Sequence, residues 1–414
     1  MRFGLLTQWY DPEPGPAALP GVLARALRSR GHEVQVLTGH PNYPSGRLAP
    51  GYRMRLRQQE RLADVDVCRV ALYPNHDSSA ARRVANYASF GASATVLGLN
   101  ALRGVDALWV NYSPITVAWP MWAAKAALRI PSVVHVLDLW PDTVLAGGFA
   151  RHERLYQAAS APLHAWCRGM YSAASAVAYI SPGAGEALRR RGVPAEKLHF
   201  IPMWADEQVF RPSTVGLREE LGLGEDQIVL LYAGTLGHAQ GLESLLQACA
   251  RVRDPRFVAL VVGSGTAEGS LRAEAERLGL TNVSFLGRFP PSRMTALMAT
   301  ADMSYVSLSP HRLSAMTMPS KTQAALAAGR AVVVAADGDV VEVVARSGAG
   351  FSAAAGDVEA IRDRLEQACR LGRPGLAELG RRASAYYHQE YSVRSGVDRV
   401  ERLLLQAAAK GAGS

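Results

Sequence analysis

The stretch LYAGTLGHAQGLESLL, residues 231–246, combines features that could bind a phosphate group. An apolar strand runs into Gly234 and Thr235, and a glycine-containing loop leads from there to a helix. Glycines let backbone N–H groups approach an anion closely. The loop has neither the GxxxxGK[ST] spacing of a nucleotide triphosphatase nor the GxGxxG spacing of a dinucleotide oxidoreductase, so neither class is indicated. Taken by itself, the stretch is equally well a plain strand-to-helix turn.

A second candidate for anion binding is Lys321, within MPSKTQAALAAGRAVVVA, residues 318–335. Pro319 and Ser320 begin a helix, and Lys321 lies in its first turn. The helix dipole disfavours a cation at that place. A cation placed against the helix dipole at a helix start indicates that an anion binds there. The alternative is an ordinary solvated lysine.

Two motifs in the first half could face a sugar. In HVLDLWPD, residues 135–142, a buried strand ends close to Asp138 and Trp140. A carboxylate beside an aromatic face can orient a sugar hydroxyl, although a turn with a capping aspartate has the same pattern. In PEPGPAA, residues 12–18, Gly15 precedes a helix whose N-terminus could meet a phosphate, and a simple loop is the alternative.

Metal chemistry has little support in the sequence. DVD at 64–66 and DGD at 337–339 resemble metal-binding DxD motifs, but such triplets are common in loops. The histidines are unclustered, and none of the four cysteines lies within CxxC distance of another. We therefore expect neither a metal site nor a disulfide framework, but reduced, buried thiols in a cytoplasmic protein.

The elements that must position these residues alternate along the chain. Strands are predicted at 2–8, 33–37, 107–110, 132–136 and 176–180, and again at 227–232, 257–262, 283–286, 303–306 and 331–334, with helical spacing between them. This alternation predicts two doubly wound α/β domains that face each other across a cleft, joined by IPMWADEQVF at 201–210. Ligands of such sheets bind at the carboxyl ends of the strands.

The charge of the 414-residue chain is uneven. Its net charge is +9, and residues 1–200 carry 22 Lys and Arg against 13 Asp and Glu, whereas residues 201–414 carry 23 of each. This asymmetry indicates that the first half meets an anionic partner. Nucleic acid is not the expected partner, because no reader motif is present. No apolar run is long enough to span a membrane, and the N-terminus has the pattern of a strand rather than a signal peptide.

Taken together, these motifs resemble the retaining glycosyltransferases of the GT-B fold, in glycosyltransferase family four. The nearest resemblance is to the fucosamine-transferase-like branch that builds bacterial surface polysaccharides. It extends over nearly the whole chain. The segments that carry it are GHEVQVLTGHPNYPSGRL (31–48), LYPNHDSSAARRVANYASF (72–90), HVLDLWPD, ISPGA (180–184), AGTLGHAQGLESL, VVGSG (261–265) and the PSK helix.

The resemblance implies a division of labour between domains. Residues 1–205 would form a Rossmann-like acceptor-binding domain and 206–385 a Rossmann-like domain for the nucleotide sugar. Residues 386–414 would form a tail whose helix, expected at 386–405, crosses back to the first domain. The donor substrate would be a UDP-sugar, and no metal or other cofactor is expected, because helix N-termini and a basic side chain neutralise the diphosphate.

Roles carried over from the family fall on particular residues. The catalytic pair is Asp138 and Lys321. The donor-binding residues are Gly15, Gly234, Thr235, Gly263, Arg288, Phe289, Pro319, Ser320, Lys321 and Thr322. The acceptor-binding residues are Tyr10, Asn42, Tyr43 and Trp140.

The chain also departs from the family pattern. Met316 and Ala324 stand where the wider family often has two glutamates, the second of which binds the ribose. Leu236 and Gln240 lie near the places of the usual Arg and Lys of the loop, which leaves Lys321 as the main cation for the diphosphate.

The predicted function is retaining transfer of a sugar, such as the N-acetylamino sugars GlcNAc or FucNAc, from a UDP-sugar to a hydroxyl of a lipid-linked saccharide. Three alternatives remain: a small natural-product acceptor such as an antibiotic, a UDP-sugar epimerase, and an inactive sugar-nucleotide-binding partner. Arginines at 53, 55, 57, 61, 82 and 83 lie near an apolar stretch at 88–102, which suggests peripheral contact with an anionic membrane, at the inner face of the cell membrane. The alternative for that stretch is a core helix flanked by solvated arginines.

Overall fold

The computed structural model describes residues 1–14, 19–76, 79–142, 153–311 and 314–412. The chain forms two compact units. Unit 1 comprises Met1–Ile201 with Gly396–Ser414, and unit 2 comprises Pro202–Ser395. The divisions predicted from the sequence fall after residues 205 and 385.

Unit 1 is built on a sheet of eight strands. They are β1 (Arg2–Leu6), β2 (Glu33–Gly39), β3 (Arg57–Leu62), β4 (Val65–Val70), β5 (Ala107–Tyr112), β6 (Ser132–Val136), β7 (Ala176–Tyr179) and β8 (Leu198–Phe200), in the order β3-β4-β2-β1-β5-β6-β7-β8. All neighbours pair in parallel except β3 and β4, which form an antiparallel hairpin. The DVD motif consists of Asp64, in the turn of that hairpin, and the first two residues of β4.

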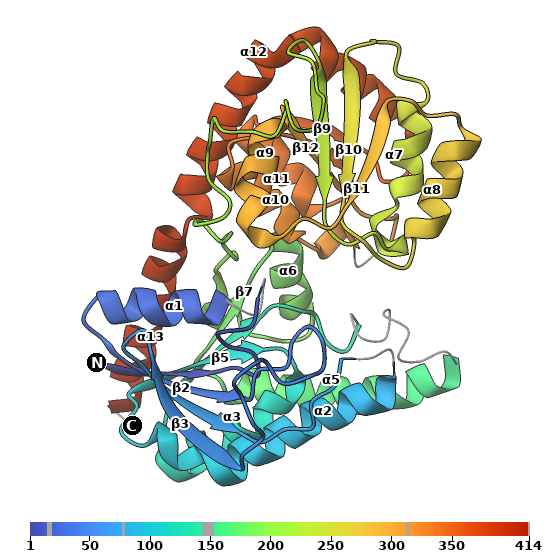
Figure 1. Ribbon diagram of the computed structural model, residues 1–414. Helices are drawn as coiled ribbons and strands as arrows, with labels where there is room; N and C mark the ends of the chain where they lie inside the picture. Colours follow the sequence, from blue (N-terminus) through green and yellow to red (C-terminus); the bar gives the residue numbers. More distant parts are fainter. Residues whose placement is uncertain (15–18, 77–78, 143–152, 312–313, 413–414) are drawn as a thin grey trace. The chain divides into compact units, whose positions relative to one another are not determined.

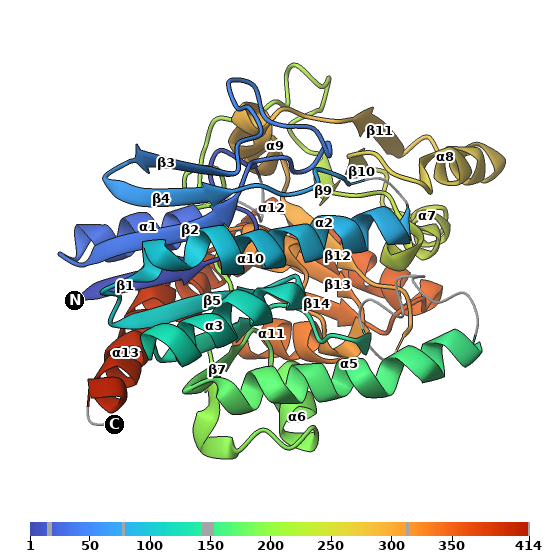
Figure 2. The same cartoon turned by 90° about the horizontal axis from the view of Figure 1, so that it is seen from below.

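Helices cover both faces of this sheet. They are α1 (Leu19–Ser29), α2 (Ala80–Ser93), α3 (Ala118–Leu128), α5 (Glu153–Ala173), α6 (Pro182–Arg190) and α13 (Val393–Ala412). Figures 1 and 2 show α1 on one face and α2, α3 and α5 on the other. Short turns lie at η2 (Ala94–Gly98), η3 (Leu99–Leu102), η4 (Ile115–Val117) and η6 (Ala195–Lys197).

The C-terminal helix α13 is attached to unit 1 by ion pairs. Arg30, just after α1, pairs with Asp398 and Glu401 at 2.5 Å each, and His32 Nε2 lies 2.6 Å from Glu401. The single helix expected over 386–405 was wrong in one respect, because the helix before α13 ends at Glu390. Ser392 causes the break: its hydroxyl accepts from the Ser395 backbone N–H at 3.2 Å, as a helix N-cap does.

Unit 2 has a fully parallel sheet of six strands. They are β9 (Ile228–Ala233), β10 (Phe257–Val262), β11 (Val283–Gly287), β12 (Met303–Ser307), β13 (Ala331–Ala335) and β14 (Gly350–Ala353), in the order β11-β10-β9-β12-β13-β14. Its central strands are near-continuous apolar runs because helices bury both faces. Alternate residues of β9 therefore enter two cores, Leu230 and Tyr232 in one and Val229 and Leu231 in the other.

The helices of unit 2 divide between these cores. They are α7 (Leu242–Cys249), α8 (Glu268–Arg277), α9 (Met294–Thr300), α10 (Ser320–Ala327), α11 (Asp339–Ser347) and α12 (Val358–Glu390), with turns η7 (His238–Gln240), η8 (Pro291–Arg293) and η9 (Ser314–Met316). α7 and α8 pack in the core of Tyr232, and α9, α10 and α11 pack in the other, as Figure 1 shows. α12 contributes to both and is kinked at Gly372. The two Rossmann-like units with parallel sheets confirm the predicted doubly wound α/β class.

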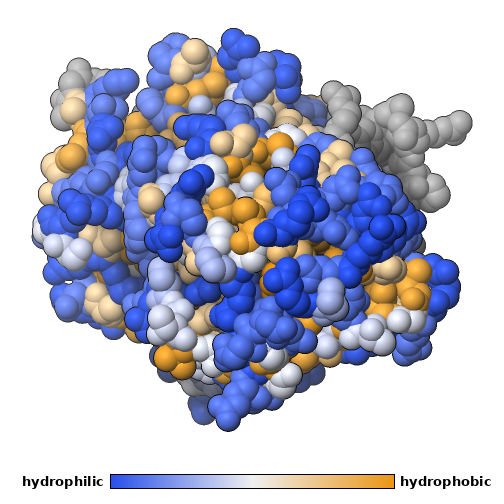
Figure 3. All heavy atoms as spheres, turned by 90° about the horizontal axis from the view of Figure 1, so that it is seen from above, coloured by the Kyte–Doolittle hydropathy of each residue, from blue (hydrophilic) through white to orange (hydrophobic). Residues whose placement is uncertain are grey.

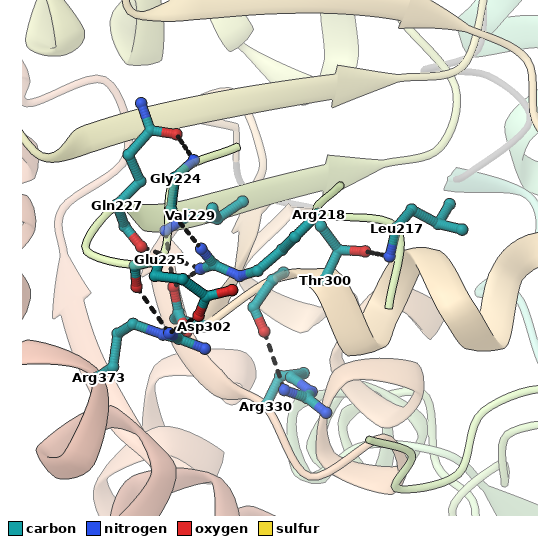
Figure 4. A network of polar contacts seen from close by, with 11 residues as sticks. Leu217, Arg218, Gly224, Glu225, Gln227, Val229, Thr300, Asp302, Arg330 and Arg373 are labelled. Atoms are coloured by element: carbon teal, nitrogen blue, oxygen red, sulfur yellow. Dashed lines mark hydrogen bonds and ion pairs between the residues drawn. The ribbon is translucent and has the colours of Figure 1, made fainter. Parts of the chain in front are cut away.

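A mostly buried carboxylate organises the amino edge of the unit 2 sheet (Figure 4). Asp302, before β12, accepts from the Val229 backbone N–H at 2.8 Å, from Arg218 at 2.9 Å and from Arg373 at 3.1 Å. Arg218 also donates to the Gly224 and Gln227 carbonyls, at 2.8 and 2.9 Å. This network fixes the segment that leads into β9, at the sheet edge opposite to the strands' carboxyl ends.

The described surface is mixed in character. On the face shown in Figure 3, hydrophilic side chains surround smaller, separate apolar areas. Among the described residues, no helix has both the length and the apolar character that crossing a bilayer requires.

Candidate functional site

The donor residues predicted in unit 2 gather at the carboxyl edge of its sheet. Gly234 and Thr235 follow β9, Gly263 follows β10, Arg288 and Phe289 follow β11, and Pro319, Ser320, Lys321 and Thr322 form the start of α10, which precedes β13. Parallel strands end at one edge, so segments distant in the sequence meet there.

Two glycines allow the ends of β9 and β10 to approach each other. Gly234 and Gly263 have φ of +153° and +134°, and a Cβ on Gly263 would lie 1.8 Å from the Gly234 carbonyl oxygen. The Gly234 N–H donates to the Val262 carbonyl at 2.9 Å, and the Gly263 N–H donates to the Gly287 carbonyl at 2.7 Å. No side chain larger than hydrogen fits between these two strand ends.

The glycine-containing loop after β9 is held on both sides. The Leu236 N–H donates to the Ser264 carbonyl at 3.0 Å, and the Ser309 N–H donates to the Ala239 carbonyl at 2.9 Å. Arg288 is exposed and donates to the Ser264 hydroxyl, which adds a basic side chain to the same edge. The loop after β9 is therefore held in place, and it offers mainly backbone groups to a ligand.

Lys321 extends from α10 to the end of β9, where this loop begins. Its Nζ donates to the Tyr232 hydroxyl at 2.9 Å and lies 4.6 Å from the centre of the Tyr232 ring. Desolvation lowers the pKa of Lys321 to about 8. Among the described residues no carboxylate forms an ion pair with it. The site thus holds a half-buried cation without a counter-ion.

The other residues at the start of α10 are divided in exposure. Ser320 is exposed, whereas Thr322 is 1% exposed and its hydroxyl has no hydrogen-bond partner within the described structure. The DGD motif lies nearby, at the start of α11. A Cβ on Gly338 would lie 1.9 Å from the Ala315 carbonyl, so this glycine lets the turn before α10 pack closely. Asp339 is buried there.

In unit 1, Asp138 follows β6 and is sheltered from water. Its Oδ2 accepts from the Ser113 hydroxyl at 3.4 Å, and its carbonyl accepts from the Trp140 N–H at 2.9 Å. Burial raises the pKa of Asp138. A carboxylate in such surroundings is a strong hydrogen-bond acceptor for a hydroxyl.

A row of aromatic side chains extends from Trp140. The ring of Trp140 lies 6.3 Å from that of Tyr87, Tyr87 lies 6.3 Å from Trp9, and Trp9 lies 6.2 Å from Tyr43 and 6.1 Å from His76. All five are partly exposed. Trp9, His76 and Tyr87 were missed as acceptor candidates. A signal existed for two of them, because His76 and Tyr87 stand in the LYPNHDSSAARRVANYASF segment.

Tyr10 and Asn42 have a different environment from Tyr43. Both are 1% exposed. Their backbone N–H groups and that of Tyr43 donate to one buried carboxylate, Glu13, at 2.9, 2.7 and 2.8 Å. Burial raises the pKa of Glu13. Glu13 therefore joins the loop after β1 to the loop after β2, and the acceptor contacts of Tyr10 and Asn42 stay predictions. Gly15 lies outside the described residues.

Within the described ranges, no group of three or more His, Cys, Asp and Glu side chains is arranged to hold a metal ion. Cys68, Cys167, Cys249 and Cys369 are buried and form no disulfide. Cys167 lies 2.9 Å from the Tyr112 hydroxyl, inside the core of unit 1.

Two family models match successive parts of the chain. Residues 15–204 match the glycosyl transferase 4-like domain, and residues 216–385 match glycosyl transferases group 1. Among curated proteins, the chain is 28% identical over 337 residues to WcaI of Escherichia coli K12, whose name assigns it to colanic acid biosynthesis. That match covers 79% of this chain and 81% of WcaI.

Solved structures share the fold. The HepE protein of Anabaena, in complex with UDP and glucose, has a TM-score of 0.70 at 19% identity and covers 98% of this chain and 100% of its own. The sucrose-phosphate synthase of Thermosynechococcus elongatus has a TM-score of 0.71 at 18% identity and covers 99% of each chain. Both are GT-B glycosyltransferases, so the fold of this chain is GT-B.

Proposed function

Because the chain is a glycosyltransferase of the GT-B fold, with a glycosyl transferase 4-like domain before a group 1 domain, we propose that it transfers a sugar from a UDP-sugar to a saccharide hydroxyl during assembly of a bacterial surface polysaccharide. The observation that carries the donor half of this proposal is Lys321 at the carboxyl edge of unit 2, a cation for which the described part of the chain supplies no counter-ion. The presence of UDP and glucose in HepE, and the name of WcaI, support the substrate class.

The chemical task of unit 2 is to accept charge on the leaving group. The bond between the sugar C1 and the UDP β-phosphate oxygen breaks, and a bond from C1 to the acceptor oxygen forms on the same face of the ring. The hydroxyl proton passes to the departing phosphate, so no separate base is needed. Lys321 stabilises the negative charge that grows on UDP, and fixed groups aimed at developing charge commonly supply the largest part of catalysis. We propose this retaining step without a metal ion.

The acceptor half of the proposal rests on unit 1. Aromatic rings bury large apolar area and suit the C–H faces of sugar rings. The row from Trp140 to Trp9 offers such faces, and Asp138, beside Trp140 in the chain, supplies an acceptor for a sugar hydroxyl. A saccharide acceptor uses both features. The transferred sugar proposed is an N-acetylamino sugar, as the fucosamine-transferase-like resemblance implies.

We propose further that the saccharide is lipid-linked and that unit 1 docks on an anionic bilayer. In the apolar stretch at 88–102, Phe90 and Leu102 are fully buried, and Val96 is its exposed large side chain. Two further exposed apolar side chains, Met54 and Leu56, lie on the edge segment, residues 53–57, with sequence Arg-Met-Arg-Leu-Arg. Leu56 is 72% exposed there, and all three arginines are exposed.

Replacement of the cation tests the donor site. We expect Lys321→Ala to lower the rate of UDP release from the best UDP-sugar by about 10²-fold or more, as loss of one charge-stabilising donor does. A thermal-shift panel of UDP-, GDP- and ADP-sugars first selects the donor, because a tight ligand raises the melting point. Lys410→Ala, an exposed lysine on α13, is the matched control and should leave the rate unchanged. An unchanged rate for Lys321→Ala would refute the proposed role.

A further inference from the structure

Lys321 and Tyr232 belong to opposite faces of the unit 2 sheet. The Tyr232 side chain lies in the core formed with α7 and α8, whereas α10, which carries Lys321, packs in the other core through Ala325 and Leu326. The Lys321 side chain therefore crosses the carboxyl end of β9 to reach the Tyr232 hydroxyl. The contact therefore joins two elements on opposite faces of the sheet, the helix α10 and the strand β9.

The crossing is possible because Gly234 lacks a side chain. A Cβ on Gly234 would lie 2.2 Å from Lys321 Cε and 2.9 Å from Nζ. The lysine stem thus runs directly over the Gly234 backbone. Its ammonium contacts the Tyr232 ring, and Nζ lies 4.6 Å from the centre of that ring.

The hydroxyl of Tyr232 is itself fixed. Tyr232 is 1% exposed, and its hydroxyl donates to the Thr235 carbonyl at 2.5 Å while it accepts from Lys321 Nζ at 2.9 Å. One tyrosine therefore connects the first turn of α10 to the loop after β9. Both donor and acceptor capacities of the hydroxyl are used by named partners.

We propose that Tyr232 is a positioning residue of the donor site, which holds the Lys321 ammonium over Gly234 before the nucleotide arrives. The proposal rests on the proposed function for the identity of the ligand, a nucleoside diphosphate. Tyr232 touches neither the sugar nor the phosphate in this scheme and acts only through Lys321.

A tyrosine suits this task better than a carboxylate. An aspartate beside Lys321 would fix the cation but would also neutralise it and repel a diphosphate. A neutral hydroxyl fixes the direction of the ammonium and leaves its charge available. The cost is a partly desolvated cation, visible in the lowered pKa of Lys321, and an incoming diphosphate offsets that cost by pairing with it.

A double-mutant cycle on nucleotide binding tests the coupling. The full chain and its Tyr232→Phe, Lys321→Ala and double variants are titrated with UDP by calorimetry. We expect Lys321→Ala to weaken UDP binding about 30-fold and Tyr232→Phe about 5-fold, because a hydrogen bond to a charged group is lost. In the Lys321→Ala background the Tyr232→Phe change should cost less than about 2-fold, because the residue it acts through is gone.

Tyr305→Phe is the matched control for this cycle. Tyr305 lies on the adjacent strand β12, is also 1% exposed, and belongs to the same core as Tyr232. Removal of its hydroxyl should leave UDP affinity unchanged. Equal losses from Tyr232→Phe with and without Lys321, or an equal loss from Tyr305→Phe, would overturn the positioning role.

A second measurement needs no nucleotide. The sequence has four lysines, Lys125, Lys197, Lys321 and Lys410, so reductive ¹³C-methylation gives few NMR signals, and Lys321→Ala identifies the signal of interest. A dimethylated ammonium keeps one N–H to donate. We expect the Lys321 signal to titrate near pH 8 in the native protein and about one pH unit lower in Tyr232→Phe, because its charged form loses an acceptor.

The two measurements separate the two claims. If UDP fails to bind the native protein, the donor site is refuted, and the NMR titration still decides the role of Tyr232. If Lys321 titrates identically in the native protein and in Tyr232→Phe, the positioning role is refuted whether or not UDP binds.

Discussion

At the scale of single residues, the donor site depends on the absence of a Cβ at Gly234. Residues other than glycine rarely adopt its φ of +153°. The space that a side chain of residue 234 would occupy is filled by Lys321. The same position thus combines a backbone requirement with a packing requirement. Either alone would make glycine necessary.

We expect Gly234→Ala to weaken UDP binding about 10-fold or more, because the new methyl group displaces the lysine stem from above β9. Calorimetry with UDP measures the loss. Gly269→Ala, in α8, is the control, since a Cβ there meets nothing within 4 Å. Native-like affinity in Gly234→Ala would show that the site does not need Lys321 where the structure places it.

The titration of Lys321 gives donor binding a pH dependence. Its pKa is lowered to about 8 by desolvation, so the ammonium is charged below pH 8 and becomes neutral as the pH rises through 8. UDP affinity should therefore fall as the pH rises above 8, by about 10-fold once the pH has reached about 9 to 9.5. The reason is that the neutral amine must first take up a proton. Calorimetry across this range measures it. Lys321→Arg keeps its charge, so its affinity should not follow this curve; a parallel decline in that variant would assign the effect to another group.

The sequence indicated these residues unevenly. The motifs pointed to Gly234 and Lys321 because glycine before a loop and a cation at a helix start are local signals. The pairing of Lys321 with Tyr232 could not be predicted, because alternation along β9 only places Tyr232 on a face and does not say what crosses the end of the strand. Glu13 was hidden for a similar reason: its three partners come from two loops that meet only after folding.

At the scale of elements, the strands that were not predicted are β3, β4, β8 and β14. In β4, with the sequence VDVCRV, polar residues interrupt the apolar ones. The edge strand β3, with the sequence RQQERL, has an alternating exposed pattern and little apolar content. β8 and β14 have three and four residues of mixed character, LHF and GFSA, whereas the equally short β7 was predicted from its apolar sequence AVAY. Parallel strands buried on both faces carry their own signal, whereas edge strands take theirs from the neighbour they pair with.

The network around Asp302 yields a prediction for the stability of unit 2 (Figure 4). Asp302→Ala removes the acceptor of Arg218 and of the Val229 N–H, and it leaves the mostly buried Arg218 charge without a counter-ion. Loss of one partner of a buried ion pair costs about 3 kcal/mol. Hydrogen exchange at β9 and β12 should accelerate accordingly, with Asp302→Asn intermediate.

An exposed ion pair provides the comparison for Asp302. Glu378 pairs with Arg381 and Arg382 on the surface of α12. Glu378→Ala should leave the exchange rates of β9 and β12 unchanged, because exposed pairs contribute little. If Asp302→Ala also leaves them unchanged, the network does not stabilise the start of the sheet.

At the scale of the whole molecule, the positive charge belongs to one half of the chain. The excess of basic residues lies within residues 1–200, and the structure gives part of it a defined place on the edge segment, residues 53–57. The Leu56 carbonyl accepts from the Ala71 N–H at 3.0 Å, so the edge segment runs beside the chain that leads to Tyr73, which is 45% exposed. Apolar and basic groups thus share one edge of unit 1, a combination that favours an anionic bilayer surface.

Charge reversal on the edge segment tests this docking. Each basic side chain near an anionic surface contributes about 1 kcal/mol, so Arg53→Glu with Arg55→Glu should lower binding to phosphatidylglycerol-containing vesicles about 30-fold or more in a flotation assay. High salt should release the native protein, because attraction between exposed charges is screened. Arg381→Glu with Arg382→Glu makes the same change in net charge on unit 2 and should float like the native protein. If both double variants lose binding equally, net charge rather than the edge segment drives association; if the native protein stays unbound, the acceptor is better sought among soluble saccharides.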